Sequence, residues 1–297
     1  MVKDSLFKWL KGGKQSAAAP PFTAPDTEPG AAEDSVEPQQ QHTGQTRSGQ
    51  TIFSADALDP ALRFRSLTVT EPDSAALEGE PQHQPAFKIR LAKSVGFRRE
   101  AGGLVGRRYS DRGYLIPQAT QDPHLFTFLA YDEGQLVGTV SVRVDSAEGL
   151  SADQLYKDEL QELRQNGCTL SEFTRLAVDV KSASKPVLAG LFHTAYLYAM
   201  KVRGVKYGVI EVNPRHVPFY RRSLKFEPLG GERTNLRVNA PAVLMCISYD
   251  MVNEMVGKYG GKPELAATER LLYPHFFSLG EEGGILERLK ELDAASR

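Results

Sequence analysis

The sequence has few cysteines, a single tryptophan and no long apolar run. Cys168 and Cys246 are the only two cysteines among 297 residues, and neither lies in a Cys-x-x-Cys motif or at a metal-ligand spacing. We therefore expect no disulfide framework, no metal site and a reduced, cytoplasmic location. No apolar segment approaches the roughly 20 residues that a membrane span requires, and the N-terminus lacks the apolar core of a signal peptide.

Apolar residues are also scarce at the start of the chain. Residues 1–85 hold nine of the 18 prolines and seven Lys and Arg against 12 Asp and Glu. Such a composition buries too little apolar surface to offset the entropy of ordering, so we expect a disordered tail over 1–85. Within it, residues 3–11 place Trp9 and three other apolar side chains among lysines, a short amphipathic helix that could make weak contact with an anionic membrane.

Periodic apolar segments begin at residue 86, where the charge also changes to 29 basic against 25 acidic residues. We expect a folded domain over 86–250 and a C-terminal helical extension over 251–297. The domain should be of mixed α/β (α+β) class, with helices on both faces of a mostly antiparallel sheet and one parallel β-α-β crossover. The predicted strands are 86–95, 125–131, 136–144, 169–180, 205–212, 225–229 and 242–249, and the predicted helices are 96–109, 152–165, 186–203, 217–224, 251–257, 264–277 and 285–292.

A charged pair, Glu172 and Arg175, interrupts the strand predicted at 169–180. Amide formation requires a base that removes the ammonium proton before the nitrogen attacks a carbonyl, and a carboxylate can do this. In a regular strand Thr174 shares the face of Glu172 and Arg175 points to the opposite face, whereas a bulge would change this arrangement. A solvated or ion-paired glutamate is the structural alternative.

Two residues after the strand at 205–212 suit acyl transfer. The Tyr220 phenol could return a proton to a thiolate leaving group, or it could pack between helix and sheet beside Phe219. Asn213 ends the strand where a ligand could reach between strands and could bind an amide of an extended pantetheine arm. An Asx-turn that caps the next helix explains Asn213 equally well.

Basic side chains are dense around the helix predicted at 217–224. A basic run is usually a solvated face, but an acidic protein partner would also suit it. Nucleic acid is not expected as a partner, because the net charge is modest and no nucleic-acid motif is present. The residues concerned are Arg215, Arg221, Arg222 and Lys225.

Residues 209–226, with Asn-Pro-Arg-His followed by Phe-Tyr, resemble a strand and helix signature of the GNAT acyltransferase superfamily. The phrase Glu172-x-Thr174-Arg175-Leu176-x-Val178 is similar to a strand of the acyl-homoserine lactone synthases and, more closely, of the FeeM-like N-acyl amino acid synthases. The second resemblance also covers Arg108-Tyr109, Gly113-Tyr114, Asp122, Gly138-Thr139 and 213–216, so it spans about 88–250.

The resemblance implies a GNAT-like fold and transfer of a fatty acyl chain from the phosphopantetheine of an acyl carrier protein to the amine of an amino acid. Glu172 would then assist deprotonation and the backbone near Ala177 and Val178 would pair with the pantetheine arm. The basic residues at 215–225 would meet the carrier. Thr174 and Asp122 would line the substrate site, and Arg107, Arg108 or Arg175 would hold the acceptor carboxylate.

One segment departs from the superfamily pattern. The glycine-rich loop that cradles the coenzyme A pyrophosphate should follow Asp179, but this chain reads Lys-Ser-Ala-Ser-Lys-Pro at 181–186. Without those glycines, backbone amides cannot approach a pyrophosphate closely at the helix N-terminus. A single phosphate could still bind Ser182, Ser184 and Lys185, so we expect a carrier protein rather than coenzyme A as donor, and no tightly bound cofactor.

Three alternatives stay open. A homoserine-lactone synthase would need the family's tryptophans near the start of the domain, and the only one here is Trp9. A coenzyme A-dependent N-acetyltransferase would need the missing loop. A non-catalytic scaffold that binds acyl carrier protein would be unaffected by Glu172→Gln. The acceptor amino acid and the acyl chain length depend on pocket shape, which no motif supplies.

Overall fold

The computed structural model describes residues 51–54, 87–115, 122–179 and 184–295. The predicted amphipathic helix at 3–11 lies outside these ranges, as does the predicted tail apart from 51–54. Those four residues form a strand, β1, which pairs antiparallel with β2. The sequence did not predict this strand, since its four residues stand alone within a Pro- and Gln-rich stretch.

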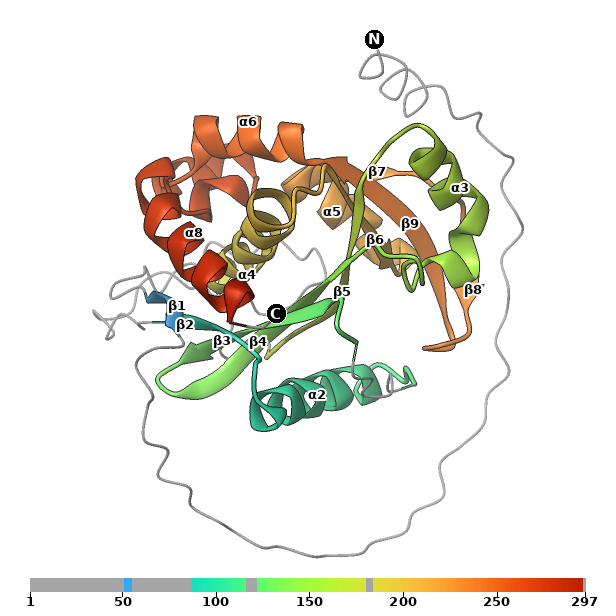
Figure 1. Ribbon diagram of the computed structural model, residues 1–297, viewed down its shortest axis with the longest axis horizontal. Coiled ribbons are helices and arrows are strands. Elements are labelled where there is room, and N and C mark those ends of the chain that lie inside the picture. Colours follow the sequence, from blue (N-terminus) through green and yellow to red (C-terminus); the bar gives the residue numbers. More distant parts are fainter. Residues whose placement is uncertain (1–50, 55–86, 116–121, 180–183, 296–297) are drawn as a thin grey trace, which may run out of the picture. The chain divides into compact units, whose positions relative to one another are not determined.

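The core of the fold is one nine-stranded mixed sheet, which confirms the predicted class (Figure 1). Its order is β1-β2-β3-β4-β5-β6-β9-β7, with β8 paired to β9. The strands are β1 Thr51–Ser54, β2 Phe87–Leu91, β3 Leu125–Asp132, β4 Gln135–Val144, β5 Leu170–Val178, β6 Tyr207–Val212, β7 Glu227–Pro228, β8 Arg233–Asn235 and β9 Ala240–Ser248.

One pair of strands, β5 and β6, is parallel, and every other pair is antiparallel. The predicted crossover is therefore confirmed. The β5–β6 ladder runs from the pair Leu170 and Tyr207 to the pair Phe173 and Ile210. β5 continues to Val178 on its β4 side, so within the described residues the two parallel strands separate beyond Phe173.

Helices cover both faces of the sheet (Figure 1). α2 packs on one face, where Leu104 and Val105 contact Ala177 of β5. The opposite face is covered by α4, with α6 and α8 beyond it. The helices are α2 Val95–Ser110, α3 Asp153–Gln165, α4 Lys185–Leu197, α5 Val217–Leu224, α6 Tyr249–Tyr259, α7 Ala266–Glu269 and α8 Leu279–Ala294.

α4 is the central helix, and its sequence explains why it is buried. The Ser184 side chain accepts a hydrogen bond from the Val187 amide, and Pro186 occupies the first turn, where no backbone donor is needed. Every residue from Pro186 to Leu197 is buried, as expected for a helix that is apolar on all sides. The predicted helix continued to 203, but a π-helical turn at Tyr198–Val202 ends it.

The C-terminal residues share the main hydrophobic core rather than forming a separate layer. Val256, Tyr273, Phe276 and Leu289 are buried in the cluster that includes α4. The helix predicted at 264–277 is wrong: this stretch forms two 3-10 turns and the four-residue α7. Pro274, inside the predicted range, and the left-handed Arg270, with φ of 52°, interrupt the helical path.

No helix of the described residues is long and apolar enough to cross a membrane.

Candidate active site

Glu172 is the buried carboxylate at the centre of the sheet. It lies on β5 between Arg143 of β4 and Val209 of β6, and only 1% of its surface is exposed. Its Oε2 accepts hydrogen bonds from the backbone amides of Ser151, at 2.6 Å, and Ala152, at 3.4 Å. These amides precede α3, so the end of that helix fixes the carboxylate without neutralising it.

Burial raises the pKa of Glu172 to about 7, and the neighbouring carboxylate of Glu211 contributes to this rise. The Arg237 guanidinium and the two amides act in the opposite direction but do not outweigh burial. A carboxylate with a pKa near neutrality can accept a proton and release it within one catalytic cycle. Glu172 therefore has the chemical properties of a general base at physiological pH.

A β-bulge changes the orientation predicted for Arg175. The β4–β5 register shifts after Thr174, which opposes Ser141, and Arg175 adopts a left-handed φ of 52°. Its guanidinium interacts electrostatically with Tyr109, Asp122 and Glu172. The expectation for a regular strand, that Arg175 faces away from Glu172, is therefore wrong, because the extra residue turns the guanidinium toward the same cluster.

Asp122 lies at this cluster as an ion-pair partner. Its Oδ2 lies 3.3 Å from Arg143 Nη2, and its Oδ1 accepts the His124 amide at 2.8 Å. Arg143 also reaches the Ser151 hydroxyl at 3.4 Å. Asp122 thus forms an ion pair with the arginine that flanks Glu172, and its role in binding substrate stays a prediction.

A second buried glutamate, Glu211 of β6, was not among the predicted site residues. Its Oε2 accepts a hydrogen bond from Asn235 Nδ2 at 3.2 Å and forms an ion pair with Arg237. Burial raises the pKa of Glu211, which the Arg237 charge counteracts. The signal in the sequence was a lone charge within the apolar run Val209-Ile210-Glu211-Val212, whereas nothing in the sequence pointed to Arg237.

Tyr109 closes the cluster from α2. It is partly buried against Leu104 and Val105, and desolvation raises the pKa of its phenol, while nearby Arg175, Arg112 and Arg237 lower it. Its ring meets that of Tyr114 edge-on, with 6.0 Å between the ring centres. The phenol thus lies among the guanidinium groups that also face the two glutamates.

Tyr220 is buried in α5, where the structure shows the packing role that the sequence left open. Its ring makes edge contacts with Phe192, Phe219 and Phe226, which is the predicted packing role. Burial raises the pKa of its phenol, and Tyr109 raises it further. The phenol is therefore protonated at neutral pH, as a proton donor to a leaving group must be.

The end of β5 holds the residues predicted to meet the donor. Ala177 and Val178 are buried and pair with Thr139 and Gly138 of β4, on the side away from β6. Lys185 is the first residue of α4, and burial lowers the pKa of its ammonium. Ser182 lies outside the described residues.

Asn213 joins the end of β6 to the loop that follows α2. Its Oδ1 accepts the Arg215 amide at 3.2 Å, which confirms the Asx-turn, and its Nδ2 donates to the Tyr114 hydroxyl at 3.1 Å. Arg215 Nη2 donates to the same hydroxyl at 3.0 Å. Arg215 was predicted to dock a carrier, and the structure shows it exposed but engaged with Tyr114.

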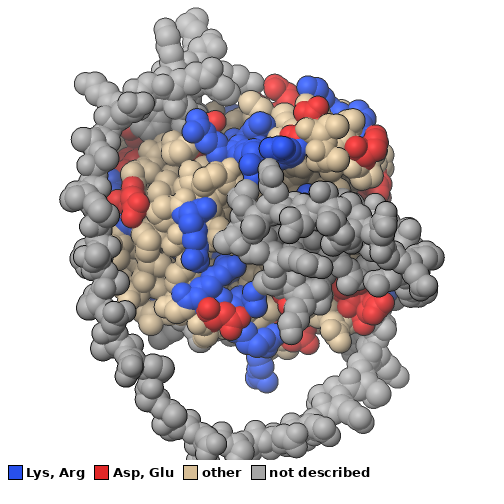
Figure 2. All heavy atoms as spheres, turned by 180° about the vertical axis from the view of Figure 1, so that it is seen from behind, with Lys and Arg blue, Asp and Glu red and all other residues tan. Residues whose placement is uncertain are grey.

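The other predicted docking residues, Arg221, Arg222 and Lys225, are exposed on or just after α5. Arg221 lies 3.3 Å from Glu227, and the pair is solvent-exposed. Figure 2 shows Lys and Arg side chains gathered in a band across the face seen there, with Asp and Glu mostly toward its edges. Because surface ion pairs contribute little stability, such basic side chains remain available for a partner.

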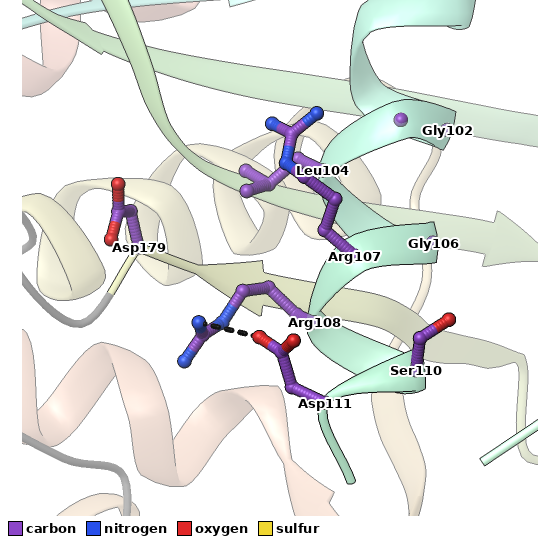
Figure 3. Close-up of a pocket in the computed structure, with 9 residues that line it drawn as sticks. Gly102, Leu104, Gly106, Arg107, Arg108, Ser110, Asp111 and Asp179 are labelled. Carbon is purple, nitrogen blue, oxygen red and sulfur yellow. Dashed lines mark hydrogen bonds and ion pairs between the residues drawn. The ribbon is translucent and has the colours of Figure 1, made fainter. Parts of the chain in front are cut away.

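A cleft of about 650 Å³ lies along α2 (Figure 3). Arg107, Arg108 and Leu104 extend from the helix toward the side on which Asp179 lies. Arg108 also donates to Asp111 at 2.9 Å. Glycines at 102, 103 and 106 leave room between these side chains, and the lining comes from α2 and from the residue directly after β5.

The sheet has a GNAT-like arrangement: one parallel pair of strands separates within a mixed sheet, and a buried carboxylate lies on β5 beside the opening. The family of N-acyl amino acid synthase FeeM matches residues 100–248, half of the chain, so the chain belongs to this family of acyltransferases.

The solved structure of one relative supports this assignment. FeeM, an N-acyl amino acid synthase from uncultured soil microbes, is 30% identical, with a TM-score of 0.52 over 56% of this chain and 92% of that one. The acyl-homoserine lactone (AHL) synthase LasI is 13% identical, with a TM-score of 0.42 over 55% and 90%. A ribosomal-protein-S5-alanine acetyltransferase from Vibrio fischeri is 14% identical, with a TM-score of 0.38 over 58% and 96%. No curated protein matches the chain.

Proposed function

We propose that this acyltransferase moves a fatty acyl chain from the phosphopantetheine thioester of an acyl carrier protein to the amine of an amino acid. The observation that carries the proposal is Glu172, a buried carboxylate with a pKa near 7 at the point where β5 and β6 separate. Membership of the N-acyl amino acid synthase family supports the reaction class.

The proton transfers follow from the two titratable groups. Glu172 accepts one proton from the acceptor ammonium, and the resulting amine attacks the thioester carbonyl. The tetrahedral intermediate collapses as the C–S bond breaks, and Tyr220 donates its proton to the departing thiolate. The nitrogen loses its second proton in this step and thereby restores the phenol, so the products are an amide, a thiol and a protonated Glu172 that releases its proton to solvent.

The opening between β5 and β6 suits an extended pantetheine arm. Backbone groups of Ala177 and Val178 that face away from β4 are directed toward this opening, so they can pair with amides of the arm as a strand would. Asn213 at the end of β6 can exchange its bond to Tyr114 for one to the arm. Ser182 and Lys185, in and after the connection to α4, would bind the single phosphate.

A carrier protein is preferred as donor because of the segment between β5 and α4. This connection, which begins at Asp179, lacks the glycines with which backbone amides enclose a pyrophosphate, and Lys185 supplies one cation at the start of α4. Arg215, Arg221, Arg222 and Lys225 would meet the acidic surface of the carrier. Charge complementarity of this kind chiefly accelerates association.

Arg175 is the strongest candidate to hold the acceptor carboxylate. The bulge brings its guanidinium to the Glu172 side, where it interacts electrostatically with Glu172, whereas Arg108 lies at the cleft along α2. A carboxylate on Arg175 would place the neighbouring α-ammonium beside Glu172, with Thr174 between them on the strand. The cleft lined by Leu104 and the three glycines of α2 would then receive part of the acyl chain.

We further propose that the protein works in the cytoplasm, because both cysteines are free and buried. The basic amphipathic segment at residues 3–11 would add weak membrane contact.

The test is to supply long-chain acyl carrier protein, or the matching acyl-coenzyme A, with the twenty amino acids, and to detect N-acyl products by mass spectrometry. Product from the carrier substrate alone supports the proposal and names the acceptor. Product only from acyl-coenzyme A would overturn the donor assignment. A catalytic-site variant, Glu172→Gln, and an exposed control, Glu232→Gln, establish that any product comes from this site.

A further inference from the structure

Glu211 has one carboxylate oxygen that is engaged and one that is not. Oε2 is held by Asn235 and Arg237, whereas Oε1 is buried and has no hydrogen-bond partner among the described residues. The side chain is only 8% exposed. A buried acceptor without a donor costs about 1–3 kcal/mol, so its persistence calls for a ligand or a function.

The strand register directs Glu211 to the same face as Glu172. Glu172 pairs with Val209 in the parallel ladder, and Glu211 lies two residues further along β6, on the same side of that strand. This step takes it past the last β5–β6 pair, toward the opening. The electrostatic effect of Glu211 on Glu172 agrees with this placement.

Charged and titratable groups surround the two carboxylates from every neighbouring element. Arg237 forms an ion pair with Glu211, and Tyr156 lies near enough for the Glu211 charge to raise the pKa of its phenol. Around Glu172 and Arg175 the remaining groups are Arg143 of β4, Tyr109 of α2 and Asp122 before β3. Arg237 binds Oε2 of Glu211, and Arg143 forms its ion pair with Asp122. Neither arginine therefore donates a hydrogen bond to Oε1.

The ammonium group of an amino-acid substrate would supply the hydrogen-bond donor that Oε1 lacks. This ammonium carries three N–H groups and one positive charge, which suit two carboxylates better than one. We propose that Glu211 Oε1 binds the acceptor ammonium and holds it beside Glu172 for deprotonation. This inference rests on the proposed function, to which it adds a substrate-binding residue and a requirement that the acceptor enter as a cation.

The proton count is unchanged by this role. Glu172 accepts one N–H proton, the positive charge leaves the nitrogen, and the contact with Glu211 weakens because a neutral amine is a poorer donor than an ammonium. The freed amine can then turn its lone pair toward the thioester. Glu211 takes no proton in this step, and its ion pair with Arg237 favours the ionised carboxylate.

Glu211→Gln tests the proposal through the choice of acceptor. We expect the KM of the preferred amino acid to rise at least tenfold, while the rate with hydroxylamine, whose nitrogen is already neutral at pH 7.5, stays within twofold of wild type. If Glu211 only supports the fold through Arg237, both acceptors should suffer equally. Equal losses, or an unchanged KM for the amino acid, would overturn the proposal.

Two further proteins make the result decisive. Glu159→Gln breaks a comparable ion pair, between Glu159 of α3 and Arg233, and should leave both acceptors unaffected. If Glu211→Gln does not fold because Arg237 is left without its counterion, the double variant Glu211→Gln, Arg237→Gln removes the stranded charge and is measured in the same way. Wild-type protein that makes no N-acyl amino acid would refute the proposed function itself, whereas active wild type with an indifferent Glu211→Gln would refute only this inference.

Discussion

Successive side chains of β5 point to opposite faces of the sheet, and one face is aromatic whereas the other is charged. Phe173 points to the side of α4, where it meets the rings of Phe192, Phe226 and Tyr249. Glu172, its neighbour, points to the side of α2 and α3, among charged groups. The aromatic face stabilises the sheet, and the stability it provides allows the other face to keep buried charges that would destabilise an isolated strand.

The charged face should respond most strongly in activity. Glu172→Gln retains an oxygen that can accept the Ser151 amide but cannot take a proton, so we expect turnover to fall about 10²–10⁴-fold with little change in fold. The measurement is the steady-state rate of amide formation, with thermal unfolding as a check. Turnover within threefold of wild type would mean that another group is the base, and Glu232→Gln serves as the exposed control.

The aromatic face should respond most strongly in stability. Phe173→Ala leaves a cavity in the core, and we expect the free energy of unfolding to fall by about 3–5 kcal/mol. Denaturant titration gives this value. The control is Leu236→Ala, because Leu236 is 80% exposed and should shift stability by less than about 0.5 kcal/mol. A loss below about 1 kcal/mol for Phe173→Ala would show that the face does not support the sheet.

Charge reversal on the basic surface of α5 should weaken binding of the acyl donor. It should change neither the chemistry of Glu172 nor the stability that Phe173 provides. Reversing Arg221, Arg222 and Lys225 to Glu should raise the KM for acyl carrier protein about tenfold or more, most strongly at low salt, because like charges would then repel an acidic carrier. The same protein should use a short acyl-pantetheine normally. A matched reversal of Lys157, Arg288 and Lys290, also exposed, should leave the carrier KM unchanged.

A smaller effect is expected where the loop after α2 meets the end of β6. Tyr114→Phe removes the hydroxyl that accepts hydrogen bonds from Asn213 and Arg215, which should cost about 1 kcal/mol of stability and less than threefold in turnover. Thermal unfolding and the steady-state rate check this prediction. A loss of turnover as large as that of Glu172→Gln would move Tyr114 into the catalytic machinery.

The sequence predicted the sheet well because strong periodicity and turn residues define each long strand and helix. It singled out Glu172 because a charge in a strand is unusual and the surrounding phrase resembles a family, and the structure shows that this carboxylate is buried. It could not decide the side on which Arg175 lies, since a bulge depends on how β4 and β5 align and has no local signature. Arg237 joins the site from the β8–β9 turn through a pairing of distant strands, which no local pattern encodes.

The helix predicted at 264–277 also shows that local sequence patterns do not encode long-range packing. Apolar spacing alone favoured a helix, but Pro274, the left-handed Arg270 and the packing of Tyr273 and Phe276 into the core determine the actual path. Tertiary contacts thus overrode a local preference. Glu211 could have been found by applying to β6 the criterion that identified Glu172.

The pH dependence of a single turnover tests the central claim, that the charged face of β5 performs the chemistry through Glu172. Because a base must be deprotonated to act, the rate of amide formation should fall as the pH drops through about 7, the pKa of the buried carboxylate. In Glu172→Gln the break near pH 7 should disappear, and the smaller residual rate should rise steadily with pH as more of the acceptor becomes free amine. A wild-type rate that is constant from pH 6 to 8, or a break near pH 7 that persists in Glu172→Gln, would contradict the account.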